Sequence, residues 1–404
     1  MTRVRGWIGA LLLALPVVNA KAAISDDEVR IGLITDLSST YRQVGLGAVI
    51  AAEMAIEDFG GKVNGKKIRL HARDHKLDAE TGMRHAKDLH ENEKVDLFIE
   101  MVGTNVALPI QRYARENGIL AIHTGSAASL LTGAECSPTS VHWSYDTYAL
   151  AAGAATAIIE QGGDSWYFIA ADYSMGRTLQ AEATGIIERR GGKVLGTSLH
   201  PLKATDFSRQ LAAAARSGAK VIALASVGDD AIRVIRQADE FGIGKNGGRR
   251  LAGLLITEAT VQDLGQLAAQ GLQLTTAFYW NYDEQTRAWS KRFRDRSGSN
   301  ATMFQASVYS VLMHYFKAVE AAGTDHARAV IAKMRALPVN DFFARNGKLR
   351  EDGRLLMDMY LLEVKRPQDV AALGDYYRLL QVIPGAQAFR PLEEGGCPYL
   401  SNKT

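Results

Sequence analysis

Cysteine is scarce in this sequence, with two residues in 404. Two thiols cannot build a disulfide scaffold or a four-thiolate zinc site. A charged fraction of 23% and a hydrophobic fraction of 47% are those of an average globular protein, which excludes disordered, collagen-like and coiled-coil chains. Because single hydrophobic cores stop growing near roughly 250–300 residues, the length predicts two domains.

Signatures of cofactor binding and of catalysis are also missing. No G-x-x-x-x-G-K-S/T motif occurs, and the pair Gly45 and Gly47 lacks the third glycine of a dinucleotide-binding fingerprint. Ser126 follows a predicted strand as a catalytic serine would, but the second glycine of that motif is absent. We therefore expect no enzymatic activity, no cofactor and no metal. Solvated or capping roles explain the closely spaced histidines better than metal binding does: His71, His75, His85 and His90.

A short apolar run at the N-terminus is the longest in the sequence. Two arginines precede about a dozen apolar residues at 7–18, too few to span a bilayer of ~30 Å. We expect residues 1–22 to be a cleaved signal peptide, and a hydrophobic N-terminal helix is the alternative. The small residues of the cleavage site are Val18 and Ala20, with Ala22 or Ala23 as alternative end points.

The expected cleavage changes the charge balance. Cleavage after Ala20 removes two arginines and lowers the net charge from +3 to +1. A nearly neutral chain has no field to gather nucleic acid or acidic lipid. No other segment approaches roughly 18 uninterrupted apolar residues, so we expect a soluble mature protein in the periplasm.

Short apolar strands alternate with amphipathic helices from residue 29 onward, which indicates parallel βαβ units. Two successive runs of about four such units predict an α/β fold with two Rossmann-like lobes. The predicted strands are 29–34, 68–72, 95–99, 120–123, 166–170, 193–199, 221–225, 251–256, 272–279, 357–364 and 376–383. The predicted helices are 47–59, 79–91, 107–117, 148–161, 178–190, 207–217, 231–241, 284–296, 304–323 and 327–337.

No low-complexity linker joins the two predicted lobes. We expect the chain to cross between them three times, near residues 137–146, 278–282 and 338–340, because several crossings make a hinge where one flexible linker would not. Residues 386–404 then form a tail that returns across this hinge. The expected limits are 24–142 plus 280–338 for the N-terminal lobe and 143–279 plus 339–385 for the C-terminal lobe.

Polar loops follow four of the predicted strands, at residues 35–41, 103–105, 124–127 and 172–176. In open α/β sheets, ligands bind outside the carboxyl ends of the strands. Small hydroxyl residues before a helix supply O–H donors, backbone N–H groups and the positive end of the helix dipole, which together favour a carboxylate. Simple N-capping explains any single loop without a ligand, so the convergence of several loops carries the prediction.

Seven segments of the sequence resemble a known family: VRIGLITDLS at 29–38, AAEMAIEDFGG at 51–61, CSPTSVHWSYDTY at 136–148, GGDSWYFIAAD at 162–172, LAGLL at 251–255, FYW at 278–280 and LPVNDFF at 337–343. They resemble type I periplasmic solute-binding proteins. More narrowly, they resemble the leucine/isoleucine/valine-binding branch of ABC importers, including relatives that bind aromatic carboxylates. The resemblance covers nearly the whole mature chain, and it implies two lobes that close on a ligand held between them.

The resemblance also implies the residues that bind this ligand. Ser39 and Tyr41 lie in the first-strand loop, which lines the cleft. Ser126 and Ala127 match the loop that holds the ligand carboxylate, and Tyr173 matches the aromatic residue that closes over the ligand. The other candidates match further cleft-facing loops and strand ends: Gly103, Thr104, Asn105, Asp229, Glu258, Tyr279 and Trp280.

The sequence departs from the family pattern at two of these loops, and the role of a third is ambiguous. The first loop reads Ser-Ser-Thr-Tyr where relatives usually have a Ser-Gly-Pro type of turn, and the 103–105 loop lacks the usual serines. In amino-acid binders, an acid after the corresponding strand holds the ligand ammonium. Here Asp229 or Asp230 either has that role or caps the helix at 231–241, and we favour the cap.

A binding protein of this kind works through its hinge. The ligand gains all of its contacts only when the lobes close, so it shifts the equilibrium by its differential affinity for the closed state. We expect a monomer that holds an amino acid or an aromatic acid at Thr104 and Ser126 and delivers it to an ABC transporter permease. A ligand-sensing receptor subunit of the same fold is the alternative.

The two cysteines allow a separate prediction. In an oxidising compartment Cys136 and Cys397 have no competing partners, and Cys136 lies at the first crossing between the lobes. We predict a disulfide that ties the tail back across the hinge, with two unpaired thiols as the alternative.

Overall fold

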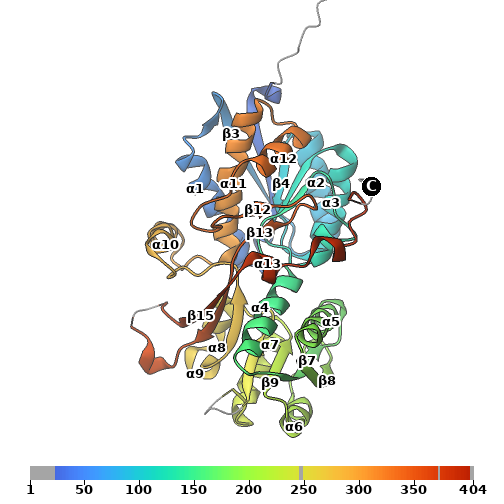
Figure 1. The fold of residues 1–404 in the computed structure, drawn as a ribbon. Coiled ribbons are helices and arrows are strands. Elements are labelled where there is room, and N and C mark those ends of the chain that lie inside the picture. Colours follow the sequence, from blue (N-terminus) through green and yellow to red (C-terminus); the bar gives the residue numbers. More distant parts are fainter. Residues whose placement is uncertain (1–22, 245–248, 372–373, 401–404) are drawn as a thin grey trace, which may run out of the picture.

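The computed structural model describes residues 23–244, 249–371 and 374–400, and the expected signal peptide lies outside these residues. The described chain forms two large sheets, each covered by helices, in two lobes that lie one above the other in Figure 1. We call them the N-terminal lobe and the C-terminal lobe. None of the described helices combines the length and hydrophobicity needed to cross a bilayer.

The N-terminal lobe is built on a six-stranded sheet with a parallel centre and one antiparallel edge. Its strands are, in order, β2 (Lys62–Val63), β3 (Lys66–Asp74), β1 (Glu28–Thr35), β4 (Leu97–Glu100), β5 (Leu120–His123) and β6 (Ser140–His142). Its helices are α1 (Arg42–Asp58), α2 (Ala79–Glu91), α3 (Thr104–Asn117), α10 (Glu284–Ser297), α11 (Met303–Ala322) and α12 (Ala327–Ala336).

The C-terminal lobe is built on a seven-stranded sheet, in which two antiparallel strands extend one edge of a parallel sheet. Its strands are, in order, β15 (Tyr377–Ile383), β14 (Met359–Val364), β11 (Gln273–Thr276), β10 (Arg250–Gly253), β9 (Val221–Ala225), β7 (Ser165–Ala171) and β8 (Lys193–His200). Its helices are α4 (Thr147–Glu160), α5 (Ser174–Arg189), α6 (Ser208–Arg216), α7 (Gly228–Glu240), α8 (Glu258–Leu264), α9 (Gln266–Ala269) and α13 (Gly385–Ala388).

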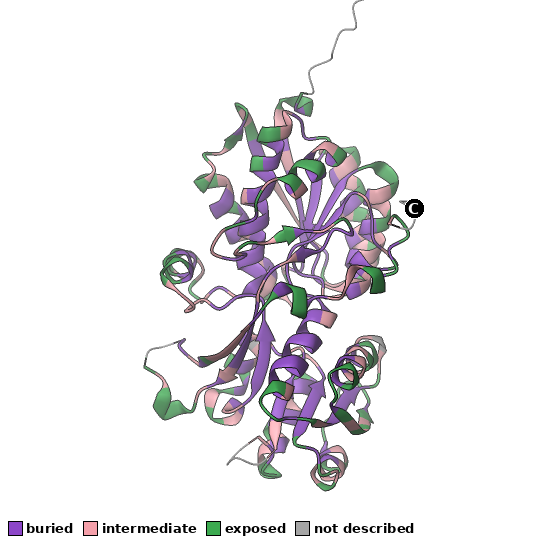
Figure 2. Cartoon of the chain, in the orientation of Figure 1, coloured by how far each residue is buried: buried purple, intermediate pink, exposed green. Residues whose placement is uncertain are grey.

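The central strands are buried on both faces, as Figure 2 shows. In β1, Val29, Ile31 and Leu33 face one hydrophobic cluster, while Ile34 faces another. In β7, Phe168 and Ile169 likewise pack into different clusters. Successive side chains of a strand point to opposite faces, so both faces of each sheet need a cover of helices. This arrangement explains why these strands are continuous apolar runs.

Three crossings join the lobes. The chain passes from β6 into α4, from β11 into α10, and from α12 through the β12–β13 hairpin (Lys348–Leu349 and Leu355–Leu356) into β14. Buried polar contacts hold the crossings together: the His142 N–H donates to the Gly353 carbonyl at 2.8 Å, and Arg354 Nη1 lies 3.4 Å from Asp146 Oδ2. The crossings lie near the predicted positions, whereas the domain limits stay a prediction.

Both ends of the described chain are fastened to the N-terminal lobe. Cys136 and Cys397 form a disulfide with a Cα–Cα distance of 5.5 Å, as the sequence predicts. In the same tail, Arg390 donates to the Ser129 carbonyl at 3.0 Å. At the other end, the N–H and hydroxyl of Ser25 both donate to Asp325 at 2.7 Å.

The structure differs from the predicted elements where tertiary contacts override local preference. Helix α1 starts at Arg42 rather than at residue 47. A Cβ at Gly45 would collide with the Asp36 carbonyl, so only glycine fits at this position of helix α1. Glycine has a low helix propensity, which hid the first turn of α1 in the sequence. Strand β6 lies in a stretch for which no strand or helix is predicted, and its polar residues Ser140 and His142 are buried. Strand β11 ends at Thr276, three residues earlier than predicted.

Candidate functional site

Two of the predicted loops meet at the carboxyl edge of the N-terminal sheet. Strands β4 and β5 are parallel neighbours, so the segments that follow them lie side by side. Thr104 begins helix α3 after β4, and Ser126 follows β5. Thr104 Oγ1 lies 3.4 Å from Ser126 Oγ, with Ser126 buried and Thr104 half-buried. The structure therefore brings together the two hydroxyls predicted to hold a carboxylate.

Backbone N–H groups add to these hydroxyls. Tyr145 donates to the Gly125 carbonyl at 3.2 Å, and His142 Nε2 lies 2.9 Å from the Ser126 carbonyl oxygen. In a trans peptide the C=O and N–H point in opposite directions, so the N–H groups of Ser126 and Ala127 point away from the hinge. Within the described residues, neither N–H has a backbone acceptor. Two N–H groups and two hydroxyls, beside the positive end of helix α3, suit an anion.

The first-strand loop is organised by a residue that the sequence analysis did not select. The buried carboxylate of Asp36 accepts the Ser39 N–H at 2.7 Å, the Ser39 hydroxyl at 2.6 Å and the Tyr41 N–H at 2.7 Å. Burial alone would raise the pKa of Asp36, but these hydrogen bonds hold it below its usual value. The Ser39 hydroxyl is thus used within its own loop, while burial and Asp36 raise the pKa of Tyr41.

Tyr173 brings the C-terminal lobe to this site. It follows β7 at the carboxyl edge of the second sheet and is half-buried. Burial raises the pKa of Tyr173 to about 12, and Tyr41 and Asp230 add to the rise. The electrostatic influence of Tyr41 on Tyr173 places the hydroxyl groups of the two side chains in the same region, with one from each lobe. Beside them, the Ser129 hydroxyl donates to Glu182 on α5 at 2.6 Å and links the two lobes directly.

The two aspartates at the start of α7 have other partners. Val227 is the N-cap of α7, and the helix has no side-chain cap, so the favoured capping role of Asp229 or Asp230 is wrong. Asp229 is exposed and lies 3.6 Å from Arg233. Asp230 is buried, pairs with Arg233 at 3.1 Å and accepts the Lys203 N–H at 3.0 Å. The buried Asp230 therefore already has a cationic partner in Arg233, which also lies near the exposed Asp229.

The remaining candidates are engaged elsewhere in the fold. Asn105 donates to the Leu77 carbonyl at 2.9 Å, and Glu258 is buried beside the Thr276 hydroxyl at 3.5 Å. Tyr279 donates to the Tyr377 carbonyl at 2.9 Å, and Trp280 donates to the Gly374 carbonyl at 3.2 Å. These last two contacts are with the β15 edge of the C-terminal sheet, so ligand contact by Tyr279 and Trp280 stays a prediction.

Sequence reasoning missed the residues that support the loops. Asp36, Glu100, His142 and Tyr145 are all buried beneath or beside the donors. An acidic residue directly after an apolar strand was a usable signal for Asp36 and Glu100. His142 and Tyr145 lie in the segment 136–148 that resembles the family, but the sequence pattern assigned neither of them a role.

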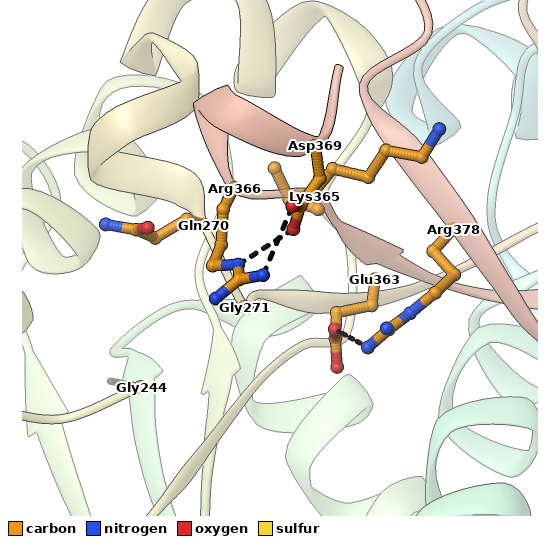
Figure 3. Close-up of a pocket in the computed structure, with 9 residues that line it drawn as sticks. Gly244, Gln270, Gly271, Glu363, Lys365, Arg366, Asp369 and Arg378 are labelled. Atoms are coloured by element: carbon orange, nitrogen blue, oxygen red, sulfur yellow. Dashed lines mark hydrogen bonds and ion pairs between the residues drawn. The ribbon is translucent and has the colours of Figure 1, made fainter. Parts of the chain in front are cut away.

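Two cavities among the described residues have linings that include none of these donors. One, of about 550 Å³, lies at the edge of the C-terminal lobe, and its arginines are paired with its acids, Arg366 with Asp369 and Arg378 with Glu363 (Figure 3). The other, of about 420 Å³, lies between α1 and α10. Within the described residues, no group of three or more His, Cys, Asp or Glu side chains could hold a metal ion.

Two α/β lobes, three crossings and converging donors at facing sheet edges define a hinged ligand-binding protein. The chain belongs to the periplasmic binding protein family, whose model matches residues 28–369. It is of type I, the class of branched-chain amino acid ABC transporters, and this family is not enzymatic. The predicted fold and family are confirmed. Comparison with curated proteins gives no match.

Solved structures agree with this assignment. A periplasmic binding protein from Burkholderia mallei is 39% identical, with 92% of this chain and 99% of that chain covered and a TM-score of 0.84. A branched chain amino acid ABC transporter periplasmic ligand-binding protein from Burkholderia xenovorans is 32% identical, with the same coverage and a TM-score of 0.89. A solute-binding protein from R. palustris in complex with benzoate shares the fold at 21% identity, covering 88% and 97%, with a TM-score of 0.75.

Proposed function

We propose that this protein captures a small carboxylate, an amino acid or an aromatic acid, between its lobes in the periplasm and delivers it to an ABC transporter permease. One observation carries the proposal. The hydroxyls of Thr104 and Ser126, 3.4 Å apart, adjoin the N–H groups of Ser126 and Ala127, which have no backbone acceptor within the part of the chain that the structure describes. This set has four donors and no fixed positive charge, which matches the two oxygens of a carboxylate.

The contacts of the ligand are divided between the lobes. The anion donors belong to the N-terminal lobe, and Tyr173 follows strand β7 of the C-terminal lobe. Closure therefore adds the aromatic contact to a carboxylate that is already bound, so the closed state binds the ligand more tightly. The relatives of branched-chain amino acid transporters and the benzoate complex support the two ligand classes.

The carboxylate contact is the better supported half of this proposal. Arg233 already pairs with the buried Asp230, so a ligand ammonium would compete with Arg233 for this carboxylate. A panel that contains amino acids and the matching acids without the amino group separates the two classes. Tighter binding of the acids without the amino group is the expected outcome.

Isothermal titration against this panel tests the proposal. Thr104→Val and Ser126→Ala each remove one hydrogen bond to a charged group, worth about 1.5–3 kcal/mol, and are expected to weaken binding about 10- to 100-fold. Ser165→Ala is the matched control. It removes a hydroxyl that accepts the Lys220 N–H at 3.1 Å, at the opposite edge of the C-terminal sheet. Unchanged affinity in both cleft variants would remove the assigned carboxylate site.

A further inference from the structure

Glu100 ends strand β4 directly beneath the two anion-binding loops. Its side chain is fully buried. Its Oε2 accepts the Val102 N–H at 2.8 Å, and its backbone carbonyl accepts the Gly125 N–H at 3.2 Å. One residue thus holds the loop that leads to Thr104 and the loop that leads to Ser126.

The contact between Glu100 and Gly125 is unusually close. A Cβ on Gly125 would collide with Glu100 Oε1 and would lie 3.0 Å from the Val102 Cα. Among the described residues, Oε1 has no hydrogen-bond partner. The unpaired oxygen therefore lies against the peptide that carries the Ser126 N–H, one of the proposed donors to the ligand.

The backbone at this point is strained. Glu100 has a φ of 82° and Met101 a φ of 54°, a region that residues with a side chain rarely adopt. Such conformations persist where the surrounding structure imposes them, and they concentrate at functional sites. At this strained turn the Glu100 side chain is fully buried and lies beside Gly125.

We propose that Glu100 is a positioning residue whose charge sets the affinity of the site for anionic ligands. This inference rests on the proposed function. With a neutral carboxyl group, the loops present only donors to the ligand. With a carboxylate, the side chain places a buried negative charge against Gly125, the residue before Ser126. This charge repels the negative charge of the ligand, because little water separates the two.

Glu100 is the group in this cluster that changes charge near neutral pH. Burial raises its pKa to about 7; the Thr35 hydroxyl and the Val102 N–H oppose this rise, and Asp36 adds to it. Asp36 stays ionised because its pKa is lowered. Burial lowers the pKa of His123, its neighbour on β5, to about 3, so His123 stays neutral. Burial also keeps Tyr145 neutral, because its pKa lies well above its usual value.

The test is the dissociation constant between pH 5.5 and 8.5 for the tightest acid of the panel and for its uncharged carboxamide. A ligand carboxylate with an ordinary pKa is ionised throughout this range. For the wild-type protein we expect binding of the acid to weaken about tenfold as the pH rises. Binding of the carboxamide is expected to stay constant. A wild-type affinity for the acid that does not change with pH would overturn the proposal without any variant.

Glu100→Gln keeps the acceptor for the Val102 N–H and removes the charge, so its affinity is expected to be independent of pH. Asp96→Asn is the matched control, because Asp96 precedes the other end of β4 and its pKa is also raised, to about 8, first by burial. The control is expected to keep the wild-type dependence. A pH dependence in Glu100→Gln equal to that of the wild type would refute the role of Glu100.

If no member of the panel binds, the proposed ligand class is wrong. The titration of Glu100 is then tested by a separate measurement that needs no ligand. The infrared carbonyl band of a protonated carboxyl group reports on the ligand-free protein. The band lost between pH 5.5 and 8.5 is expected to be larger in the wild type than in Glu100→Gln, because the variant lacks one carboxyl group that titrates in this range. An identical change in the wild type and Glu100→Gln would overturn the inference.

Discussion

The disulfide between Cys136 and Cys397 closes most of the chain into one loop. With a sequence separation of 261 residues, the chain-entropy relation gives about 19 cal/mol/K, or about 5.6 kcal/mol at 25 °C, for its effect on the unfolded state. We therefore expect the double variant Cys136→Ser/Cys397→Ser to lose up to about 5.6 kcal/mol of its free energy of unfolding.

The tail decides how much of this loss is observed. Phe389 is buried and packs under the Arg354 guanidinium at 4.5 Å, and Arg350 donates to the Arg390 carbonyl at 2.7 Å. If these contacts hold the tail in place without the disulfide, the full loss is expected. If the tail detaches, the folded state regains chain entropy, and the loss is smaller.

Two measurements separate these outcomes. Denaturant unfolding followed by tryptophan fluorescence gives the free energy of unfolding, and hydrogen exchange of residues 386–400 shows whether the tail stays protected. Wild-type protein unfolded in the presence of a reductant is the control and should match the double variant, which should itself be insensitive to the reductant. An unfolding midpoint equal to that of the oxidised wild type would refute this account of the disulfide.

Two further predictions concern buried charges. Arg354→Met leaves the buried Asp146 without its cation, and removing one partner of a buried pair costs about 3–5 kcal/mol; an unfolding free energy equal to the wild-type value would contradict this. Burial raises the pKa of Glu258 from 4.5 to about 7. Between pH 4.5 and about 7, the folded protein therefore keeps the proton on Glu258 while the unfolded chain loses it. The free energy of unfolding falls by about 3 kcal/mol as the pH rises through this range. Glu258→Gln should remove this part of the decline in unfolding curves recorded at pH 4.5 and 7.5, and an unaltered decline would refute it.

Much of the fold could be read from the sequence because strands and helices alternate with clear ends. The helix at 79–91 and the strand at 120–123 have the predicted limits. Asp78 caps the first of these elements, and Gly118 ends the helix before the second in a left-handed conformation. Where local chemistry marks an end in this way, tertiary structure does not need to override it.

The elements that were missed depend on distant contacts. Strand β6 is polar in sequence, but its neighbour β5 and the crossing at Gly353 pair with its backbone. Helix α8 follows directly on Thr257, a cap that accepts the Thr260 N–H, yet its short length gave no periodic signal. Such elements acquire their structure from the sheet beside them.

The candidate site was only partly predictable for a related reason. Polar loops at strand ends identified Thr104 and Ser126, which the structure brings together. The directions of the Ser126 and Ala127 N–H groups depend on the hydrogen bonds that the preceding carbonyls accept. These carbonyls bind His142 and Tyr145, which lie at the first crossing between the lobes. Sequence pattern alone carries no information on peptide orientation.

The fastening of Ser25 to Asp325 has a practical consequence. The segment Ser25–Asp27 lies at the end of the N-terminal lobe that is farthest from the C-terminal lobe (Figure 1). A linker attached at Ala23 would immobilise the protein on a biosensor chip through this end of the N-terminal lobe. Immobilised in that orientation, the protein would keep its cleft open to the solution, and the C-terminal lobe could swing without touching the support.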